Sequence, residues 1–185
     1  MENEILKVIR NRRSIRSYTQ DPISDEAIEA ILEAGIYAPS AMNQQEWHFT
    51  VVKDPQMMKK LRDIMKDNML NSGVPAMVER ASAEGFVAFH NAPVLIFLSA
   101  DEKVRSALID GGIAVENMAL AAESLGLGSC IMTSSVILFN VDQEGTLVHE
   151  LGFPAGYKHV CTLSLGYKAE FPEPKPRREN LVNII

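Results

Sequence analysis

The sequence is poor in the residues that most enzymes use for chemistry with their own side chains. It contains two cysteines and four histidines in 185 residues. Cys130 and Cys161 lie far apart in apolar surroundings, which is typical of free thiols in a reducing compartment and not of a disulfide framework. No obvious nucleophile, acid–base pair or metal-ligand motif is present. We therefore expect a bound cofactor to carry any enzymatic chemistry.

The histidines do not form a recognisable metal motif. His149 is followed by Glu150, but no second histidine stands four residues after the first, as a zincin motif requires. His48, His90 and His159 have no ligand partner nearby in the sequence. Each is expected to be a surface histidine or a hydrogen-bonded core histidine, and no metal is predicted.

Several other motifs are missing. Gly126-Leu127-Gly128 follows a helical pattern, and Ile131 stands where a dinucleotide-binding fingerprint requires glycine or alanine. Neither a Walker loop nor a Gly-x-Ser-x-Gly elbow occurs. No apolar run approaches the roughly 20 residues of a membrane helix, and residues 1–4 lack the apolar core of a signal peptide. We therefore expect a cytoplasmic protein.

The charge distribution is uneven. The formal net charge of -6 argues against nucleic acid or an anionic membrane as the main partner. Two cationic clusters nevertheless occur, Arg12-Arg13-Ser14-Ile15-Arg16 and Lys175-Pro176-Arg177-Arg178. Guanidinium, ammonium and hydroxyl groups together suit a phosphate monoester. Either cluster alone is equally consistent with a solvated helix end or tail, but with the motifs between them they indicate a phosphate-bearing cofactor.

Local patterns predict a single domain over residues 1–168. Ser24 and Asp54 are expected to cap helices, since acidic residues follow Ser24 and Pro55 follows Asp54. A core helix is predicted over residues 106–125, ended by Gly126 and Gly128, and a short helix is predicted to open at Asp142. Strands are expected over residues 47–52, 94–98 and 158–165. Residues 68–90 are interrupted by glycine and proline and rich in methionine and phenylalanine, which suggests a pocket wall or lid.

Residues 169–185 are expected to form an arm. Alternating prolines over residues 171–176 favour an extended, polyproline-like chain, and the sequence then ends in Leu181-Val182-Asn183-Ile184-Ile185. An apolar end of this kind must dock, either on its own sheet or on a second subunit. A reach of about 3.1 Å per residue favours the second subunit.

Four motifs in order resemble the FMN-dependent nitroreductase family, and the chain is similar to its short members. They are Arg12 to Tyr18, Ala38 to Phe49, Glu116 to Cys130, and Leu165-Gly166-Tyr167 with the Lys-Pro-Arg-Arg tail. The resemblance implies an α+β sandwich with a mainly antiparallel sheet flanked by helices. It also implies an intertwined homodimer in which the C-terminal segment adds a strand to the partner's sheet. Two FMN sites would then lie at the dimer interface.

The resemblance also implies the cofactor-binding residues. The first cluster would hold the phosphate, the ribityl chain and the flavin edge, and the tail would supply a second phosphate-binding pair. A loop would reach the flavin of the other subunit, and a later segment would place backbone N–H groups near flavin N5, with Thr133 and Ser134 preferred. The residues of the first cluster are Arg12, Arg13, Ser14 and Arg16, and those of the tail are Lys175 and Arg177. The residues of the loop are Pro39, Ser40 and Asn43, and those of the later segment are Ile131, Met132, Thr133 and Ser134. Taken alone, Asn43 is equally a turn residue, and residues 133–135 are equally a polar turn.

Two positions depart from the family's pattern. Glu46 stands where the family usually has proline, which leaves the path of the preceding loop open. Some members carry a lysine near the flavin pyrimidine, but residues 84–89 contain no cation here. Arg13 or Arg80 is a candidate to stabilise the reduced flavin in its place.

The resemblance implies an FMN-dependent oxidoreductase. NADH or NADPH would deliver hydride to flavin N5, and a nitroaromatic, a quinone or a similar conjugated acceptor would then be reduced in the same pocket by ping-pong kinetics. The flavin carries this chemistry, so no side chain is predicted to be catalytic. Reductive dehalogenation or other flavin chemistry on the same fold is an alternative, as is flavin binding without turnover. The expected partners are a second copy of the chain and a small-molecule acceptor.

Overall fold

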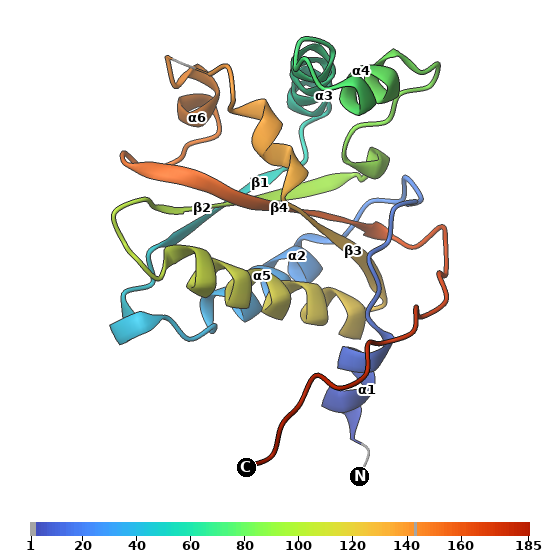
Figure 1. Ribbon diagram of the computed structural model, residues 1–185, viewed down its shortest axis with the longest axis vertical. Helices are drawn as coiled ribbons and strands as arrows, with labels where there is room; N and C mark the ends of the chain where they lie inside the picture. Colours follow the sequence, from blue (N-terminus) through green and yellow to red (C-terminus); the bar gives the residue numbers. More distant parts are fainter. Residues whose placement is uncertain (1–2, 143) are drawn as a thin grey trace.

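An antiparallel sheet divides the protein into two helical layers (Figure 1). The structure is a computed structural model that describes residues 3–142 and 144–185, so residues 1–2 and 143 of the predicted domain lie outside the described part. Within it, the sheet has the order β1-β2-β4-β3, with every neighbouring pair antiparallel. The strands are β1 (Trp47–Val52), β2 (Val94–Asp101), β3 (Leu127–Met132) and β4 (Tyr157–Tyr167). The predicted α+β sandwich is thereby confirmed.

The helices fall on opposite faces of this sheet (Figure 1). The α3 layer contains α3 (Pro55–Leu70), α4 (Pro75–Ser82), the 3-10 helix η3 (Ser134–Leu138) and α6 (Thr146–Glu150). The α5 layer contains α2 (Asp25–Ile36) and α5 (Ala107–Ser124), with α1 (Glu4–Asn11) beside the end of α5. Two short 3-10 turns, η1 (Ala41–Asn43) and η2 (Phe89–Asn91), precede β1 and β2.

The central strand β2 shows why the sheet needs both layers. Successive side chains of a strand point to opposite faces. Leu95 and Phe97 therefore pack into the core under the α3 layer, while Ile96 and Leu98 pack into the core under the α5 layer. All four side chains are fully buried. The continuous apolar run in the sequence thus follows from burial on both faces, as predicted.

Most of the local predictions are confirmed. The Ser24 hydroxyl accepts a hydrogen bond from the N–H of Ala27 at 3.2 Å, and the Asp54 carboxylate accepts one from Met57 at 2.7 Å. The predicted strands correspond to β1, β2 and β4. The short helix differs from its prediction, because it begins at Thr146 after Gly145 and not at Asp142.

The end of the core helix also differs from the prediction. Gly126 ends α5 with a left-handed φ of 78°, but Gly128 lies inside β3, which the sequence did not reveal as a strand. A Cβ at Gly128 would come within 3.0 Å of the Ile15 side chain, so the β3 backbone approaches the N-terminal segment closely. Ile113 in α5 and Leu125 at its C-cap are exposed, because this helix carries apolar side chains on more than one face.

Residues 169–185 form an extended arm, without helix or strand in the structure described. The side chains from Phe171 onward are exposed, including those of Leu181 and Val182. The arm runs back past α1, so the C-terminal residues lie in the same region as this N-terminal helix (Figure 1). Among the described helices, none combines the length and apolar character needed to cross a membrane.

Candidate functional site

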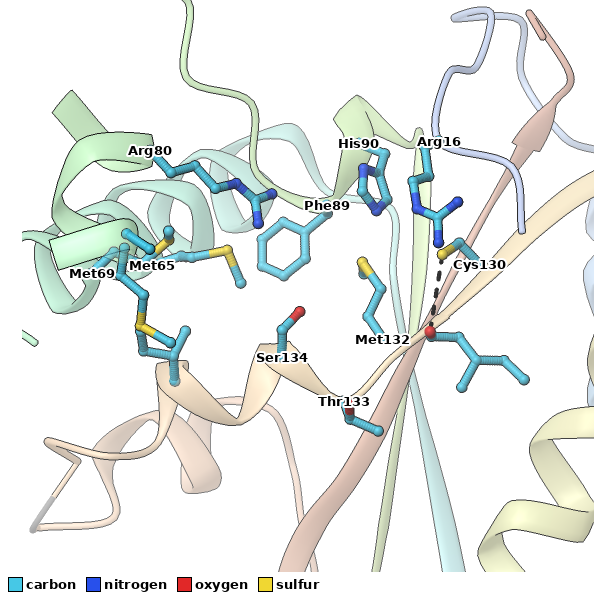
Figure 2. Close-up of a pocket in the computed structure, with 14 residues that line it drawn as sticks. Arg16, Met65, Met69, Arg80, Phe89, His90, Cys130, Met132, Thr133 and Ser134 are labelled. Carbon is cyan, nitrogen blue, oxygen red and sulfur yellow. Dashed lines mark hydrogen bonds between the residues drawn. The ribbon is translucent and has the colours of Figure 1, made fainter. Parts of the chain in front are cut away.

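A cavity of about 480 Å³ lies within the α3 layer, between the end of β3 and helices α3 and α4 (Figure 2). Its lining combines the N-terminal segment, helices α3 and α4, the turn η2, and the end of β3 with the following η3, which come from five separate parts of the sequence. The lining residues are Arg16, Met65, Met69, Ala76, Met77, Arg80, Phe89, His90, Cys130, Ile131, Met132, Thr133, Ser134 and Ile137.

The segment that leaves β3 forms one side of the cavity. Met132 makes the last β3–β4 pair, opposite Thr162, and Thr133 and Ser134 then lead into η3. The hydroxyl of Ser135 donates a hydrogen bond to the carbonyl of Met132 at 2.8 Å, which fixes this change of direction. The predicted residues 131–134 therefore all line the cavity, although two of them are strand residues and not part of a loop.

The opposite wall is apolar and adaptable. Met65 and Met69 project from α3, and Met77 projects from α4. Methionine side chains are flexible and polarizable, so such a wall can accommodate flat ligands of different outline. The prediction that residues 68–90 form a pocket wall is confirmed by this placement. Met65 was not predicted, because its helical position alone is equally typical of a core residue.

The turn η2 has an unusual backbone conformation. Phe89, His90 and Asn91 have φ values of 52°, 57° and 55°, in the left-handed region of backbone conformation that residues other than glycine rarely adopt. Two hydrogen bonds hold the end of the turn: the Asn91 N–H donates to Ala88 at 3.0 Å, and the Gln20 side chain donates to the Asn91 carbonyl at 3.0 Å. This conformation places Phe89 and His90 in the cavity lining.

Three cationic or potentially cationic side chains share the cavity, Arg16, Arg80 and His90 (Figure 2). The same three line an adjoining cavity of about 490 Å³. Burial lowers the pKa of His90, and the positive charges of Arg16 and Arg80 lower it further. The imidazole is therefore neutral near pH 7 and lies between two permanent cations. His90 had no partner nearby in the sequence, because its partners come from other elements.

The other members of the first cationic cluster do not reach the cavity. The Arg12 guanidinium pairs with Glu116 of α5, with Nε 3.3 Å from Oε1. The Arg13 guanidinium donates to the carbonyls of Arg10 and Arg12, and Arg13 is not among the residues that line the cavity. Ser14 forms a bridge to Ser129 in β3. Arg16 is thus the one member of the cluster that lines the cavity.

The remaining predicted residues lie elsewhere in the chain. The loop containing Pro39, Ser40 and Asn43 is attached to the start of α5, where the Asp110 carboxylate accepts a hydrogen bond from the N–H of Ala41 at 3.0 Å. The tail residues Lys175 and Arg177 are exposed on the arm, and neither belongs to the cavity lining. One chain therefore brings together Arg16 and residues 131–134, and it leaves the other two predicted groups apart.

Glu46, which departs from the family's proline, lies at the base of that loop. Its side chain and that of Asp110 are both 5% exposed. The Ser106 hydroxyl lies 3.5 Å from Oε1 of Glu46, while Oε2 has no hydrogen-bond partner within the described residues. Burial and the neighbouring Asp110 raise the pKa of Glu46, whereas the N–H of Ala41 holds the pKa of Asp110 below its usual range. The pKa values of these two buried carboxyl groups are therefore shifted in opposite directions.

Comparisons with known proteins place this arrangement in a familiar context. The model of the nitroreductase family matches residues 9–167. The chain is 30% identical over 185 residues to the FMN reductase [NAD(P)H] of Bacillus subtilis, covering 95% of this chain and 70% of that protein. It is 31% identical over 183 residues to the NADPH-flavin oxidoreductase of Vibrio harveyi, with the same coverages. A solved nitroreductase with bound FMN from Bacteroides fragilis superposes with a TM-score of 0.92 at 33% identity, covering both chains completely.

Proposed function

We propose, from the premise that this chain belongs to the nitroreductase family, that it reduces flat conjugated acceptors such as nitroaromatics or quinones. The protein is an NAD(P)H-dependent flavin oxidoreductase with FMN as its cofactor. The observation that carries the proposal is the shared cavity, in which Arg16 and Thr133–Ser134 face an apolar wall of methionines. Donor and acceptor would use this cavity in turn.

The residues around the cavity suit FMN. Arg16 supplies a cation, the segment of residues 131–134 supplies backbone and hydroxyl groups, and Phe89 with the methionines supplies apolar surface for a ring. When bound, FMN accepts hydride from NAD(P)H and passes the electrons to the acceptor. The chain's own contribution is to bind and orient the ring, to place N–H groups and cations near its polar edge, and to limit the access of water.

The distribution of the predicted residues supports a homodimer. The 39–45 loop and the tail cations lie away from the cavity of their own chain, so they can complete a site only in a partner. The α5 layer and the arm also carry many exposed apolar side chains, more than an isolated chain is expected to leave in water. These include Ile36, Tyr37, Met42, Leu108, Ile109, Leu181 and Val182. We propose that a second copy covers this surface, with the arm crossing to its sheet.

The first experiment is the visible spectrum of the purified protein before and after anaerobic addition of NADH or NADPH. We expect flavin absorbance that bleaches on addition of the donor and returns when a nitroaromatic or quinone is added. A flavin spectrum that neither donor bleaches would contradict the proposed reaction. Light scattering should give about twice 20.5 kDa, and a clean monomer would contradict the dimer.

The structure bears differently on three other predictions. Flavin binding without turnover was suggested by the missing lysine, but Arg16 and Arg80 both bring cations to the cavity. Reductive dehalogenation stays an alternative, and parallel assays with halogenated, nitro and quinone acceptors distinguish it. The cytoplasmic location also stays a prediction, supported by two cysteines that are buried and not linked to each other.

A further inference from the structure

Arg80 lies where two cavities meet. It lines both the main cavity and the adjoining one, and Arg16 and His90 are the other residues with this double position. Figure 2 shows these three side chains along one side of the main cavity, with Thr133 and Ser134 on the other side. The two guanidinium groups and the imidazole come from the N-terminal segment, from α4 and from η2, so the fold and not a local sequence motif brings them together.

The acidic groups in the described part of the chain near this junction do not pair with Arg80. Glu170 accepts a hydrogen bond from the backbone N–H of Arg16, and Glu84 lines the adjoining cavity. Within the described residues, no carboxylate lies within ion-pair distance of Arg80. The Arg80 guanidinium is therefore available to an anionic group of a ligand in the cavity.

The proposed function requires one cation beside the flavin, and Arg16 can supply it without Arg80. If Arg16 serves the cofactor, a guanidinium and an imidazole remain free to contact a second molecule. The surface beside them is apolar and is formed by Phe89, Met69 and Met77. An apolar surface beside a cation suits a flat ring that carries one anionic group, because the two parts of the ligand then meet matching environments.

We infer that Arg80 and His90 form an anion subsite that binds the carboxylate of a flat aromatic acceptor. The inference rests on the proposed function and specifies the class of acceptor. The left-handed turn at residues 89–91 supports it, since strained backbone is retained where the surroundings hold a side chain in a required place. Arg80 is itself exposed, so we expect a moderate effect on affinity and not an absolute requirement.

The test compares two probes that differ in charge but hardly in shape, 4-nitrobenzoate and 4-nitrobenzamide. Their dissociation constants for the oxidised, FMN-loaded protein are measured by calorimetry, and kcat/KM is measured with each as acceptor. We expect the wild-type protein to prefer the benzoate. Arg80→Gln should reduce this preference up to about fivefold while changing affinity for the amide less than twofold.

Two further variants make the test specific. Arg62→Gln removes an exposed arginine of α3 that lines a different cavity, so it should leave the preference unchanged. His90→Asn removes the imidazole but keeps a residue that tolerates the left-handed φ of 57°, and it should reduce the preference in the same direction. It also provides a second variant if Arg80→Gln folds poorly.

Three results would overturn the inference. One is a wild-type protein that binds both probes equally, and another is an Arg80→Gln variant that weakens both to the same extent. The third is a change in KM for NADH or NADPH with an unchanged preference between the probes, which would assign Arg80 to the donor. Failure of the proposed function is seen separately, because NAD(P)H would then not bleach the flavin although the binding preference is measured without turnover.

Discussion

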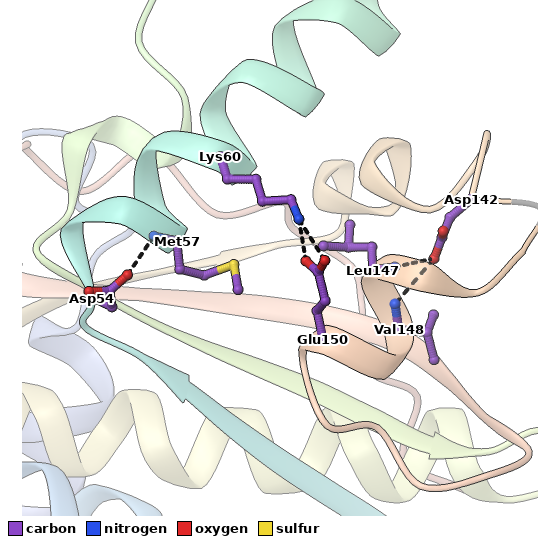
Figure 3. A network of polar contacts seen from close by, with 7 residues as sticks. All are labelled: Asp54, Met57, Lys60, Asp142, Leu147, Val148 and Glu150. Atoms are coloured by element: carbon purple, nitrogen blue, oxygen red, sulfur yellow. Dashed lines mark hydrogen bonds and ion pairs between the residues drawn. The ribbon is translucent and has the colours of Figure 1, made fainter.

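Lys60 in α3 and Glu150 in α6 form an ion pair across the α3 layer, with Lys60 Nζ 2.7 Å from Glu150 Oε1 (Figure 3). The pair connects the helix that carries the methionine wall to a short helix far along the sequence. The same short helix is held at its start by Asp142, whose carboxylate accepts hydrogen bonds from the N–H groups of Leu147 and Val148, each at 3.1 Å. Asp142 thus supports this helix from a position four residues before its first residue.

The ion pair between Lys60 and Glu150 should contribute little stability by itself. Its side chains are 47% and 33% exposed, so solvent screens the attraction. A double-mutant cycle with Lys60→Ala and Glu150→Ala should give a coupling energy of at most about 1 kcal/mol, and the coupling should decrease in high salt. The more exposed pair Lys59–Asp63, at 73% and 55%, serves as the control and should couple more weakly. A coupling well above 1 kcal/mol that is insensitive to salt would contradict this view.

Glu46 should make the protein less stable as the pH rises. Its pKa is raised in the folded protein, so between its ordinary value and the raised value the native state binds more protons than the unfolded chain. Its stabilising contribution is therefore complete below the ordinary value of 4.5 and is lost as the pH increases through the raised pKa. Glu46→Gln removes this titration. The difference between the Tm of the variant and that of the wild-type protein should therefore shift in favour of the variant as the pH increases from 5 to 8.

The control for that measurement is Glu29→Gln, which removes an exposed carboxylate on α2. Its Tm relative to wild type should be nearly independent of pH over the same range. If Glu46→Gln behaves in the same way as this control, the pKa of Glu46 is not raised in the folded protein.

His159 should remain neutral well below the usual range of histidine. Burial lowers its pKa to about 4, and its Nε2 lies 3.1 Å from the Ser135 hydroxyl while its ring stacks on Phe139. Below about pH 6.5 the unfolded chain binds a proton that the native ring does not bind, so stability should fall as the pH decreases toward 4. The maximum effect is on the order of 3 kcal/mol, from a pKa difference of about 2.5.

An NMR titration of the histidine ring protons measures this directly, and His159→Gln assigns the signal. The same variant should show a weaker decrease of stability between pH 6.5 and pH 4.5 in urea unfolding. A ring that titrates near pH 6.5 would show that water reaches it in solution.

Arg16 and Lys175 should both contribute to FMN affinity. Charge-assisted hydrogen bonds are worth about 1.5–3 kcal/mol, so Arg16→Ala and Lys175→Ala should each weaken FMN binding by about tenfold or more in a fluorescence titration. Arg178→Ala, at a neighbouring exposed position, should change it less than twofold. Unchanged flavin occupancy in the double variant Arg16→Ala/Lys175→Ala would remove the phosphate assignment. Because Lys175 does not line its own chain's cavity, a loss with Lys175→Ala alone would also support the exchanged arm.

Local patterns were sufficient for most of the secondary structure. The helix starts at Ser24 and Asp54 depend on a cap within three residues, and strand β2 depends on a continuous apolar run. Both features can therefore be predicted from a short stretch of sequence. Strand β3 was missed because Leu127-Gly128-Ser129-Cys130-Ile131-Met132 contains small and polar residues with weak strand preference. Its strand conformation is stabilised by its pairing with β4 and by its close approach to Ile15, and the local sequence specifies neither contact.

The candidate site likewise combines features that the local sequence predicts with features that depend on the tertiary structure. The sequence by itself determined the capped helices, the buried strands, the cationic clusters and the family, because these depend on residue type and spacing within one segment. Only the tertiary structure decided that Arg16 lines the cavity while Arg12 pairs with Glu116, and that Arg80 and His90 join Arg16 there. The physical reason is that long cationic side chains take the partners that the fold brings near them. Those partners depend on the strand order β1-β2-β4-β3 and on one left-handed turn, which no local pattern specifies.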